Sequence, residues 1–300
     1  MTSKTLIVIV GPTASGKTRM AIELAKHYKT EIISADSRQF FKEISIGTAK
    51  PSLEEQSQAP HHFINSHSIF DDINAGSFER EALIVIDKLF KTHDQLILVG
   101  GSGLYINAVC EGFDNLPKGD ETIRTQLNKE FEENGIEPLQ LRLKELDPEY
   151  YTSIDLSNSQ RVIRALEVCL ISGQPFSSFK SNIKKERPFN IIKIGINLDR
   201  EELYNRINHR VDLMMEAGLL EEVKKVIVHK DTYALQTVGY TELFDYLEGK
   251  QSLERAIELI KQNTRRFAKR QLTWFNRDKN TVWFKPDEEE NIMAYLDSLM

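Results

Sequence analysis

The chain has 300 residues, of which 40% are hydrophobic and 28% are charged, an ordinary balance for a soluble globular protein with a sizeable core. Its longest apolar stretches, Leu6–Val10 and Leu96–Val99, are far shorter than the roughly 20 residues that span a bilayer. The first residues run directly into a strand and leave no room for a signal peptide, so we expect a cytoplasmic protein with no membrane contact. The net charge of −6 does not indicate nucleic-acid binding, which would need local basic clusters.

The two cysteines, Cys110 and Cys169, both lie in apolar segments. We expect both to be buried free thiols, because free cysteine behaves as a small hydrophobic residue. The sequence contains no Cys-x-x-Cys pair, and this excludes a zinc finger of the usual spacing.

The first third of the chain alternates predicted strands with predicted helices. The β-branched run Thr5–Val10 predicts a buried parallel strand, and Thr18–Tyr28 follows with apolar residues at helical spacing. A short strand is expected at Glu31–Ser34, a helix at Phe78–Phe90 and a second buried strand at Gln95–Val99. This alternation predicts an α/β fold with a parallel sheet and right-handed crossovers.

Residues 115–188 differ from the segments on either side because they predict helices only. The next expected strand is Phe189–Leu198, so this region is a helical insertion between core strands. Segments 1–114 and 189–300 then form one core, and its C-terminal part is mostly helical. The elements expected in and after the insertion are helices at Asp120–Gly135, Pro138–Leu146 and Ser159–Ser172 and a last short strand at Thr281–Phe284.

The segment from Gly11 to Thr18 matches the P-loop pattern G-x-x-x-x-G-K-[ST] and lies, as that motif requires, between a buried strand and a helix. Its backbone N–H groups and the helix N-terminus form a nest for phosphate oxygens. Lys17 adds a positive charge, and the Thr18 hydroxyl is suited to bind Mg²⁺. The residues expected to bind a diphosphate or nucleotide are Gly11, Pro12, Thr13, Ala14, Ser15, Gly16, Lys17 and Thr18.

The strand Gln95–Val99 lacks the aspartate that usually holds Mg²⁺ in P-loop nucleotide hydrolases. It ends in two glycines instead, and Asp94 stands at its opposite end. This weakens the hypothesis of an ATPase or GTPase. A small-metabolite or nucleotide kinase stays open, because Asp36 follows the second strand and can act as a base toward a phosphoryl acceptor.

Several segments, taken in order, resemble the bacterial tRNA dimethylallyltransferases over most of the chain. They are Gly11–Thr18, Asp36–Gln39, Ile46–Pro51, Pro60–His62, Val99–Tyr105, Val238–Tyr240 and Thr264–Trp274. The resemblance implies a P-loop α/β core, a helical insertion that closes over the tRNA anticodon arm, and a magnesium-dependent, monomeric enzyme. The implied donor is dimethylallyl diphosphate. The implied acceptor is the adenosine on the 3′ side of the anticodon in tRNAs that read codons beginning with U.

Two positions depart from the pattern of that family. Ser102 stands where the family usually has Thr, so a hydroxyl is kept and a methyl group is lost. The usual His-Pro-Asn-Asp run of the insertion is replaced by Asp155–Asn158, which changes some detail of tRNA contact, while Gln160, Arg161 and Arg164 remain.

The implied reaction needs a base, because the exocyclic N6 of adenosine must lose a proton as diphosphate leaves. Asp36, expected one strand away from the P-loop, is the predicted base, with a helix cap or a magnesium-shell carboxylate as the alternative. Lys17, the loop amides and Mg²⁺ would stabilise charge on the diphosphate. Arg210 resembles a family arginine that reaches it, and Ser102 would hydrogen-bond the leaving oxygen or the nucleotide. The alternative for Arg210 is a surface ion pair, and the alternative for Ser102 is a plain turn residue.

Binding of tRNA requires basic surfaces despite the net charge. A late helix carries Lys261, Arg265 and Lys269 among five cations without an intervening acid, and Phe267 is expected on its apolar face. A second basic cluster is expected at Lys180–Arg187. The predicted tRNA-binding residues are Asp36, Ser37, Arg38, Gln39, Ser102, Arg124, Gln160, Arg161, Val162, Ile163, Arg164, Arg265 and Lys269.

Within that set, Arg38 and Gln39 are expected to grip nucleotides beside an extruded base. His61 and His62 are expected to be structural, since adjacent side chains on a strand point apart. Three other functions stay open at this point. They are prenyl transfer to free AMP, ADP or ATP, a small-metabolite kinase, and a non-catalytic RNA-binding module.

Overall fold

The computed structural model describes residues 4–114, 116–180 and 184–300, which divide into two compact units. The first consists of Met1–Cys110 and Arg187–Met300, and the second of Glu111–Glu186. The sequence places Arg187 in the insertion, and this is wrong. Its guanidinium lies 2.8 Å from the carboxylate of Glu79, with both side chains at most 10% exposed, and it also donates to a backbone carbonyl of the first unit.

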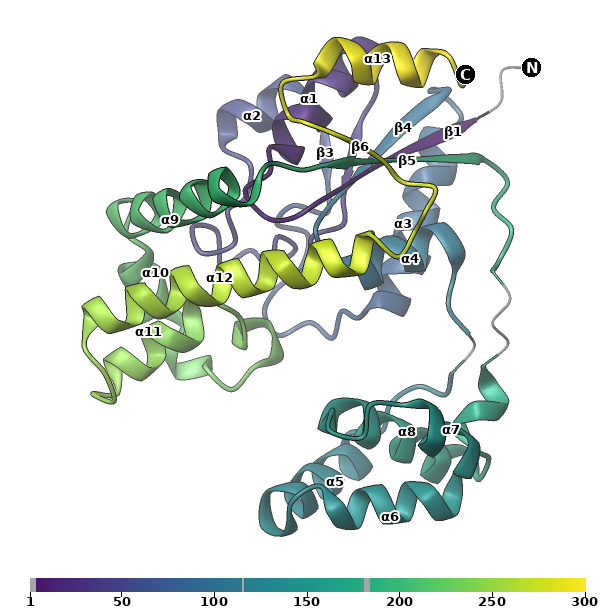
Figure 1. The fold of residues 1–300 in the computed structure, drawn as a ribbon, viewed down its shortest axis with the longest axis vertical. Coiled ribbons are helices and arrows are strands. Elements are labelled where there is room, and N and C mark those ends of the chain that lie inside the picture. Colours follow the sequence, from purple (N-terminus) through teal and green to yellow (C-terminus); the bar gives the residue numbers. More distant parts are fainter. Residues whose placement is uncertain (1–3, 115, 181–183) are drawn as a thin grey trace. The chain divides into compact units, whose positions relative to one another are not determined.

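The strands of the first unit form a parallel sheet in the order β3-β2-β4-β1-β5-β6 (Figure 1). The central strand β1 is wholly buried and pairs in parallel with β4 and β5, as its apolar β-branched run predicts. The predicted α/β fold is therefore confirmed. The strands are β1 (Thr5–Val10), β2 (Ile32–Ser34), β3 (His61–His62), β4 (Gln95–Val99), β5 (Asn190–Ile196) and β6 (Val282–Phe284).

Helices cover both faces of this sheet. Ile7 and Ile9 pack in one cluster with Met20, Ile292 and Leu296, so α1 and α13 cover one face, while α3 and α4 lie on the other (Figure 1). The predictions omit α2, α4 and α13. The helical elements are α1 (Lys17–Tyr28), α2 (Leu53–Gln58), α3 (Ala75–Leu89), α4 (Gly103–Glu111), α9 (Arg200–Glu216), α10 (Leu219–Val226), η2 (Ile227–His229), η3 (Tyr233–Leu235), α11 (Tyr240–Leu247), α12 (Leu253–Phe275) and α13 (Glu289–Asp297).

The long helix α12 differs from its sequence prediction at one aromatic residue. Phe267 is 39% exposed, whereas the buried stripe runs through Ile260, Ala268, Gln271 and Phe275. The stripe follows a helical period that leaves Phe267 at its edge. A polar residue, Gln271, takes a place in the stripe, because it has hydrogen-bond partners there.

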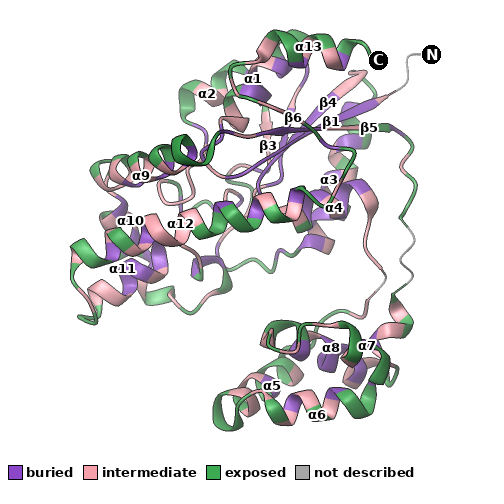
Figure 2. Cartoon of the chain, viewed as in Figure 1, coloured by how far each residue is buried: buried purple, intermediate pink, exposed green. Residues whose placement is uncertain are grey.

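The second unit has a core of its own, in which Leu139, Leu143, Val162 and Leu166 are fully buried (Figure 2). Both cysteines of the chain are buried free thiols, as predicted. Within the described ranges, no helix is long and apolar enough to cross a membrane. The helical elements of this unit are α5 (Glu121–Asn134), α6 (Glu137–Leu146), α7 (Pro148–Ser153), α8 (Ser159–Ser172) and η1 (Phe176–Phe179).

Candidate active site

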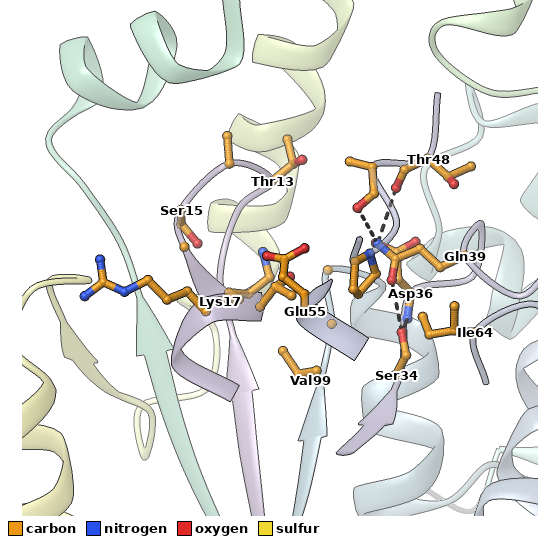
Figure 3. A pocket seen from close by; sticks show the side chains of 18 of the residues that line it. Thr13, Ser15, Lys17, Ser34, Asp36, Gln39, Thr48, Glu55, Ile64 and Val99 are labelled. Atoms are coloured by element: carbon orange, nitrogen blue, oxygen red, sulfur yellow. Dashed lines mark hydrogen bonds between the residues drawn. The ribbon is translucent and has the colours of Figure 1, made fainter. Parts of the chain in front are cut away.

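The P-loop connects β1 to α1 and lines a cavity of about 260 Å³ where the sheet strands end (Figure 3). At the turn into α1, Gly16 has a φ of +96°, a conformation that L side chains rarely adopt. Residues 13–18 all line the cavity, whereas Gly11 and Pro12 do not. The structure therefore gathers most of the predicted phosphate-binding residues around one space.

Lys17 projects from the first turn of α1 into this cavity. Its ammonium donates a hydrogen bond to the Pro12 carbonyl, with Nζ and O 2.5 Å apart. Burial lowers the pKa of Lys17 to about 7, Asp36 opposes that shift, and Arg210 adds to it. An anion bound in the cavity would favour the charged form of this lysine.

Asp36 lies across the cavity from the P-loop, two residues after the end of β2 (Figure 3). Because β4 lies between β1 and β2, two strand spacings separate it from the P-loop, and the predicted single spacing is wrong. Burial raises the pKa of Asp36, while the backbone N–H of Arg38, 3.1 Å from Oδ1, and the charge of Lys17 lower it. The proton affinities of Asp36 and Lys17 are therefore shifted toward each other.

Arg210 of α9 adds a second cation to the same space. Its Nη1 lies 3.4 Å from the hydroxyl oxygen of Thr13 in the P-loop. Burial lowers the pKa of Arg210, although Glu55 and Asp36 act against this shift. The structure thus brings Lys17, Arg210 and Asp36 together, as a site for an anion and a base requires.

Two buried polar atoms of the cavity have no hydrogen-bond partner among the described residues. One is the hydroxyl of Ser15 in the P-loop, and the other is Nε2 of His61. Nδ1 of His61 lies 2.8 Å from the Ala59 carbonyl, so Nδ1 carries the hydrogen and Nε2 is an acceptor. Burial lowers the pKa of His61, which favours the neutral ring. Buried polar atoms are nearly always paired, so both indicate a place for a ligand.

The cavity also offers oxygen atoms of the kind that Mg²⁺ prefers. Thr18, Asp36 and Glu55 all line it. In the described part of the chain, no group of three or more His, Cys, Asp or Glu side chains is arranged to hold a metal. The hydroxyl of Thr18 and the carboxylates of Asp36 and Glu55 fit Mg²⁺, which proteins usually hold through one or two carboxylates, water and substrate phosphates.

The comparisons with known proteins show the family of the chain. A sequence profile of the family described as IPP transferase matches residues 39–278. The chain belongs to the IPP transferase family. It is 54% identical over 297 residues to the tRNA dimethylallyltransferase of Christiangramia forsetii and 51% identical over 296 residues to that of Cytophaga hutchinsonii. These alignments cover 99% of this chain and 98% and 97% of the two relatives.

Solved structures of IPP transferases share the fold. The full-length tRNA isopentenylpyrophosphate transferase from Bacillus halodurans is 38% identical, with a TM-score of 0.73 over 99% of this chain and 95% of its own. A eukaryotic dimethylallyltransferase, solved acting on tRNA, is 26% identical, with a TM-score of 0.79 over 95% of this chain and 75% of its own.

Ser102, a predicted site residue, contacts the turn that carries Asp36. It is not among the residues that line the cavity. Its hydroxyl accepts the backbone N–H of Ser37 at 3.0 Å and donates to the Ser37 hydroxyl at 3.1 Å. In this IPP transferase, Ser102 therefore braces the turn that carries Asp36, and its contact with the leaving oxygen or the nucleotide stays a prediction.

Arg38 and Gln39 also have protein partners. The Arg38 guanidinium donates to the carbonyls of Tyr233 and Ala234 at 3.0 and 3.2 Å and covers the Tyr233 ring. Gln39 lines the cavity, and its amide donates to the carbonyls of Thr48 and Ala49 (Figure 3). Both side chains thus hold neighbouring loops in place around Asp36.

The predicted tRNA-binding residues of the insertion fall into three groups. Val162 and Ile163 are buried in its core, so their side chains are not available to RNA, contrary to the prediction. Arg124 and Arg164 pair with the buried carboxylate of Glu167 at 3.1 and 2.6 Å. The third group, Gln160 and Arg161, is exposed at the start of α8.

The basic residues of α12 differ in whether they have protein partners. Arg265 donates to Oδ1 of Asn208 at 2.5 Å and stacks near Tyr204. Lys261 pairs with Asp212. Lys269 is exposed and forms no ion pair among the residues that the structure describes. It is therefore the freer of the two α12 residues that the sequence predicts to bind tRNA.

Three residues of the second predicted basic cluster have partners within the described residues. Lys184 pairs with Glu111 at 2.8 Å, and Lys180 lies over the Tyr150 ring. Arg187 is buried against Glu79, so Lys184 and Arg187 are both paired with carboxylates.

Gln271 is a site residue that the predictions omit. Its side-chain oxygen accepts the backbone N–H of Thr13 at 2.8 Å, and its amide nitrogen donates to the Gly101 carbonyl at 2.9 Å. It thus links the P-loop to the glycine-rich turn after β4. A polar residue within the apolar stripe of α12 is the signal that would have revealed it.

Proposed function

We propose that this chain transfers a dimethylallyl group from dimethylallyl diphosphate to N6 of the adenosine 3′-adjacent to the anticodon in tRNAs that read codons beginning with U. The products are N6-(dimethylallyl)adenosine and diphosphate. Family membership supports the reaction class. The observation that carries the proposal is one cavity that holds a P-loop and Arg210 on one side and Asp36 on the other.

Each residue of the cavity has its own role in the proposed reaction. The C1–O bond of the donor breaks and the N6–C1 bond forms, while the N6 proton passes to the carboxylate of Asp36. Lys17, Arg210 and the P-loop amides hold the diphosphate, which gains charge as it leaves. Mg²⁺, held through the Thr18 hydroxyl and the diphosphate oxygens, would supply further positive charge there. A raised pKa suits Asp36 to this task, because a base works best with a pKa near the working pH.

The acceptor base must leave the stacked anticodon loop to reach N6. We propose that the cavity receives it on the side of Asp36 and Gln39, with the neutral His61 as a hydrogen-bond acceptor. Lys269 of the core and Gln160 and Arg161 of the insertion would contact the anticodon stem-loop. We further propose that the enzyme acts as a monomer in the cytoplasm.

The test is nucleoside mass spectrometry after incubation of the purified protein with Mg²⁺, dimethylallyl diphosphate and an unmodified tRNA transcript. We expect N6-(dimethylallyl)adenosine only when the transcript carries adenosine next to the anticodon. A transcript with guanosine at that position is the matched control. Prenylation of free AMP in place of tRNA would refute the proposal and favour an adenylate prenyltransferase.

A parallel incubation with ATP separates this function from phosphoryl transfer. We expect little release of phosphate with or without tRNA, because β4 ends without the aspartate that holds Mg²⁺ in nucleotide hydrolases. Rapid phosphate release that is lost on Lys17→Ala would support a kinase or hydrolase instead.

A further inference from the structure

The carboxylate of Glu222, on α10, holds a loop of the core by its backbone. It accepts the N–H groups of Ser45, Ile46 and Gly47 at 2.8, 2.9 and 3.0 Å. It also accepts the hydroxyl hydrogen of Tyr240, at 2.6 Å. Four donors from two separate segments thus converge on one carboxylate that does not itself line the cavity.

The loop that Glu222 holds, residues 45–51, is a wall of the reaction cavity. Thr48, Ala49 and Pro51 line that cavity, and another part of the loop lines a neighbouring hollow of about 450 Å³. Ala49 has a φ of +48°, which a residue with a side chain seldom adopts. Such a conformation persists only where surrounding contacts determine it.

A chain of hydrogen bonds leads from this loop to Asp36. The carbonyls of Thr48 and Ala49 accept from the Gln39 amide at 3.3 and 3.1 Å. The Gln39 backbone N–H in turn donates to the Asp36 carbonyl at 3.1 Å. Movement of residues 45–47 would therefore reach the turn that carries the proposed base.

We propose that Glu222, together with Tyr240, is a positioning residue that fixes the loop 45–51, and through Gln39 the turn of Asp36, in the geometry of transfer. The catalytic part of this inference rests on the proposed function. The negative charge of Glu222 is needed because all four groups that face its carboxylate are hydrogen-bond donors. Burial and Glu222 raise the pKa of Tyr240, so its hydroxyl keeps the proton that it donates.

Glu222→Gln tests the inference, because glutamine has nearly the same shape but turns an N–H₂ group toward these donors. We expect the single-turnover rate at saturating substrates to fall on the order of 10²-fold, because small displacements of reacting groups reduce a rate by about this factor. The affinity for inorganic pyrophosphate should not change, because Glu222 makes no hydrogen bond to the P-loop.

Glu242→Gln is the matched control. Glu242 is a buried carboxylate that, like that of Glu222, accepts several hydrogen bonds; its donors are Gly239, Thr241 and Asn263, none of which belongs to the loop. We expect it to lower the melting temperature as much as Glu222→Gln does and to leave the transfer rate unchanged. Equal loss of rate in the two variants would show a general stabilising role and overturn the inference.

Hydrogen exchange gives a test that does not depend on turnover. The amides of residues 45–49 should exchange faster in Glu222→Gln, while those of the P-loop should not. Gly47→Ala should act likewise, since a Cβ there would lie 2.6 Å from the Tyr240 ring. Unchanged exchange in both variants would refute the positioning role, even if the wild type proved to catalyse another reaction. A wild type that transfers no prenyl group would refute the proposed function alone.

Discussion

The buried carboxylate of Glu167 in the insertion and the buried charges of the core cavity differ in their surroundings. In the insertion, the Glu167 side chain is 1% exposed and has Arg124, Arg164 and the Asp120 N–H as partners. In the core cavity, Lys17 and Asp36 share a space with polar atoms that have no hydrogen-bond partner in the described part of the chain. A buried charge with a full set of partners marks a scaffold, whereas one beside unpaired atoms marks a site for a ligand.

The same contrast explains why charged residues of similar appearance differ in function. The arginines that pair with Glu167 use their donors within the insertion: Arg124 joins α5 to α8, and Arg164 pairs with Glu167 inside α8. Burial lowers the pKa of Lys17 to about 7 and raises that of Asp36, because the effect of burial is larger than that of the neighbouring groups that oppose it. Substitutions at Glu167 and in the core cavity should therefore have different consequences.

Replacing the P-loop lysine should give the largest effect. Lys17→Ala should abolish measurable turnover, since removal of one group that stabilises transition-state charge costs about 10²- to 10³-fold and here also weakens diphosphate binding. Affinity for tRNA, measured by filter binding, should stay close to that of the wild type. An equal loss of tRNA affinity would show that Lys17 contacts the acceptor as well as the donor.

Asp36→Asn should separate chemistry from binding. It keeps the size of the side chain but cannot take the N6 proton, so single-turnover transfer should fall by about 10²- to 10⁴-fold. Dissociation constants for pyrophosphate and tRNA should change far less. A near-normal rate would make Asp36 structural, and His61, whose neutral Nε2 faces the same cavity, would then be the next residue to substitute.

Glu167→Gln tests the scaffold side of the comparison. Loss of this carboxylate leaves two arginines without their partner, but both are partly exposed and can reach water, so we expect a cost of about 1 to 3 kcal/mol. Hydrogen exchange should accelerate in residues 116–180 and stay unchanged in the P-loop. If the transfer rate at saturating substrates fell as in Asp36→Asn, Glu167 would have a role beyond the scaffold.

The pH dependence of pyrophosphate binding tests the charge state of Lys17 in the core cavity. Lys17, with a pKa of about 7, is mostly neutral at pH 8, and a bound anion favours its charged form. Binding at pH 8 should therefore take up nearly one proton more than at pH 6, and affinity should weaken as the pH rises above about 7. Calorimetry in buffers of different ionisation enthalpy measures this uptake. Lys17→Arg, which stays charged, is the control and should lose this difference.

The sequence predicts the parallel core, the P-loop and α8, because each follows from local periodicity or a contiguous motif. It does not predict what depends on contacts between distant segments. Nothing local shows that Glu222 binds the loop at Ser45, or that Gln271 links the P-loop to the turn after β4. Sequence likewise cannot show that Ser102 contacts Ser37, since the strand order determines that approach.

The smallest expected effects are those of substituting two cations of α12, Lys269 and Arg265. The first has an exposed ammonium, and the second binds another side chain of the core. Lys269→Ala should weaken tRNA binding several-fold and reduce the salt slope by about 1, because the exposed ammonium has no protein partner in the described part of the chain. Arg265→Ala should change the slope less, since its guanidinium already binds Asn208. Both variants should keep a near-normal rate at saturating tRNA. Equal slopes for both would mean that Arg265 exchanges Asn208 for phosphate when RNA binds.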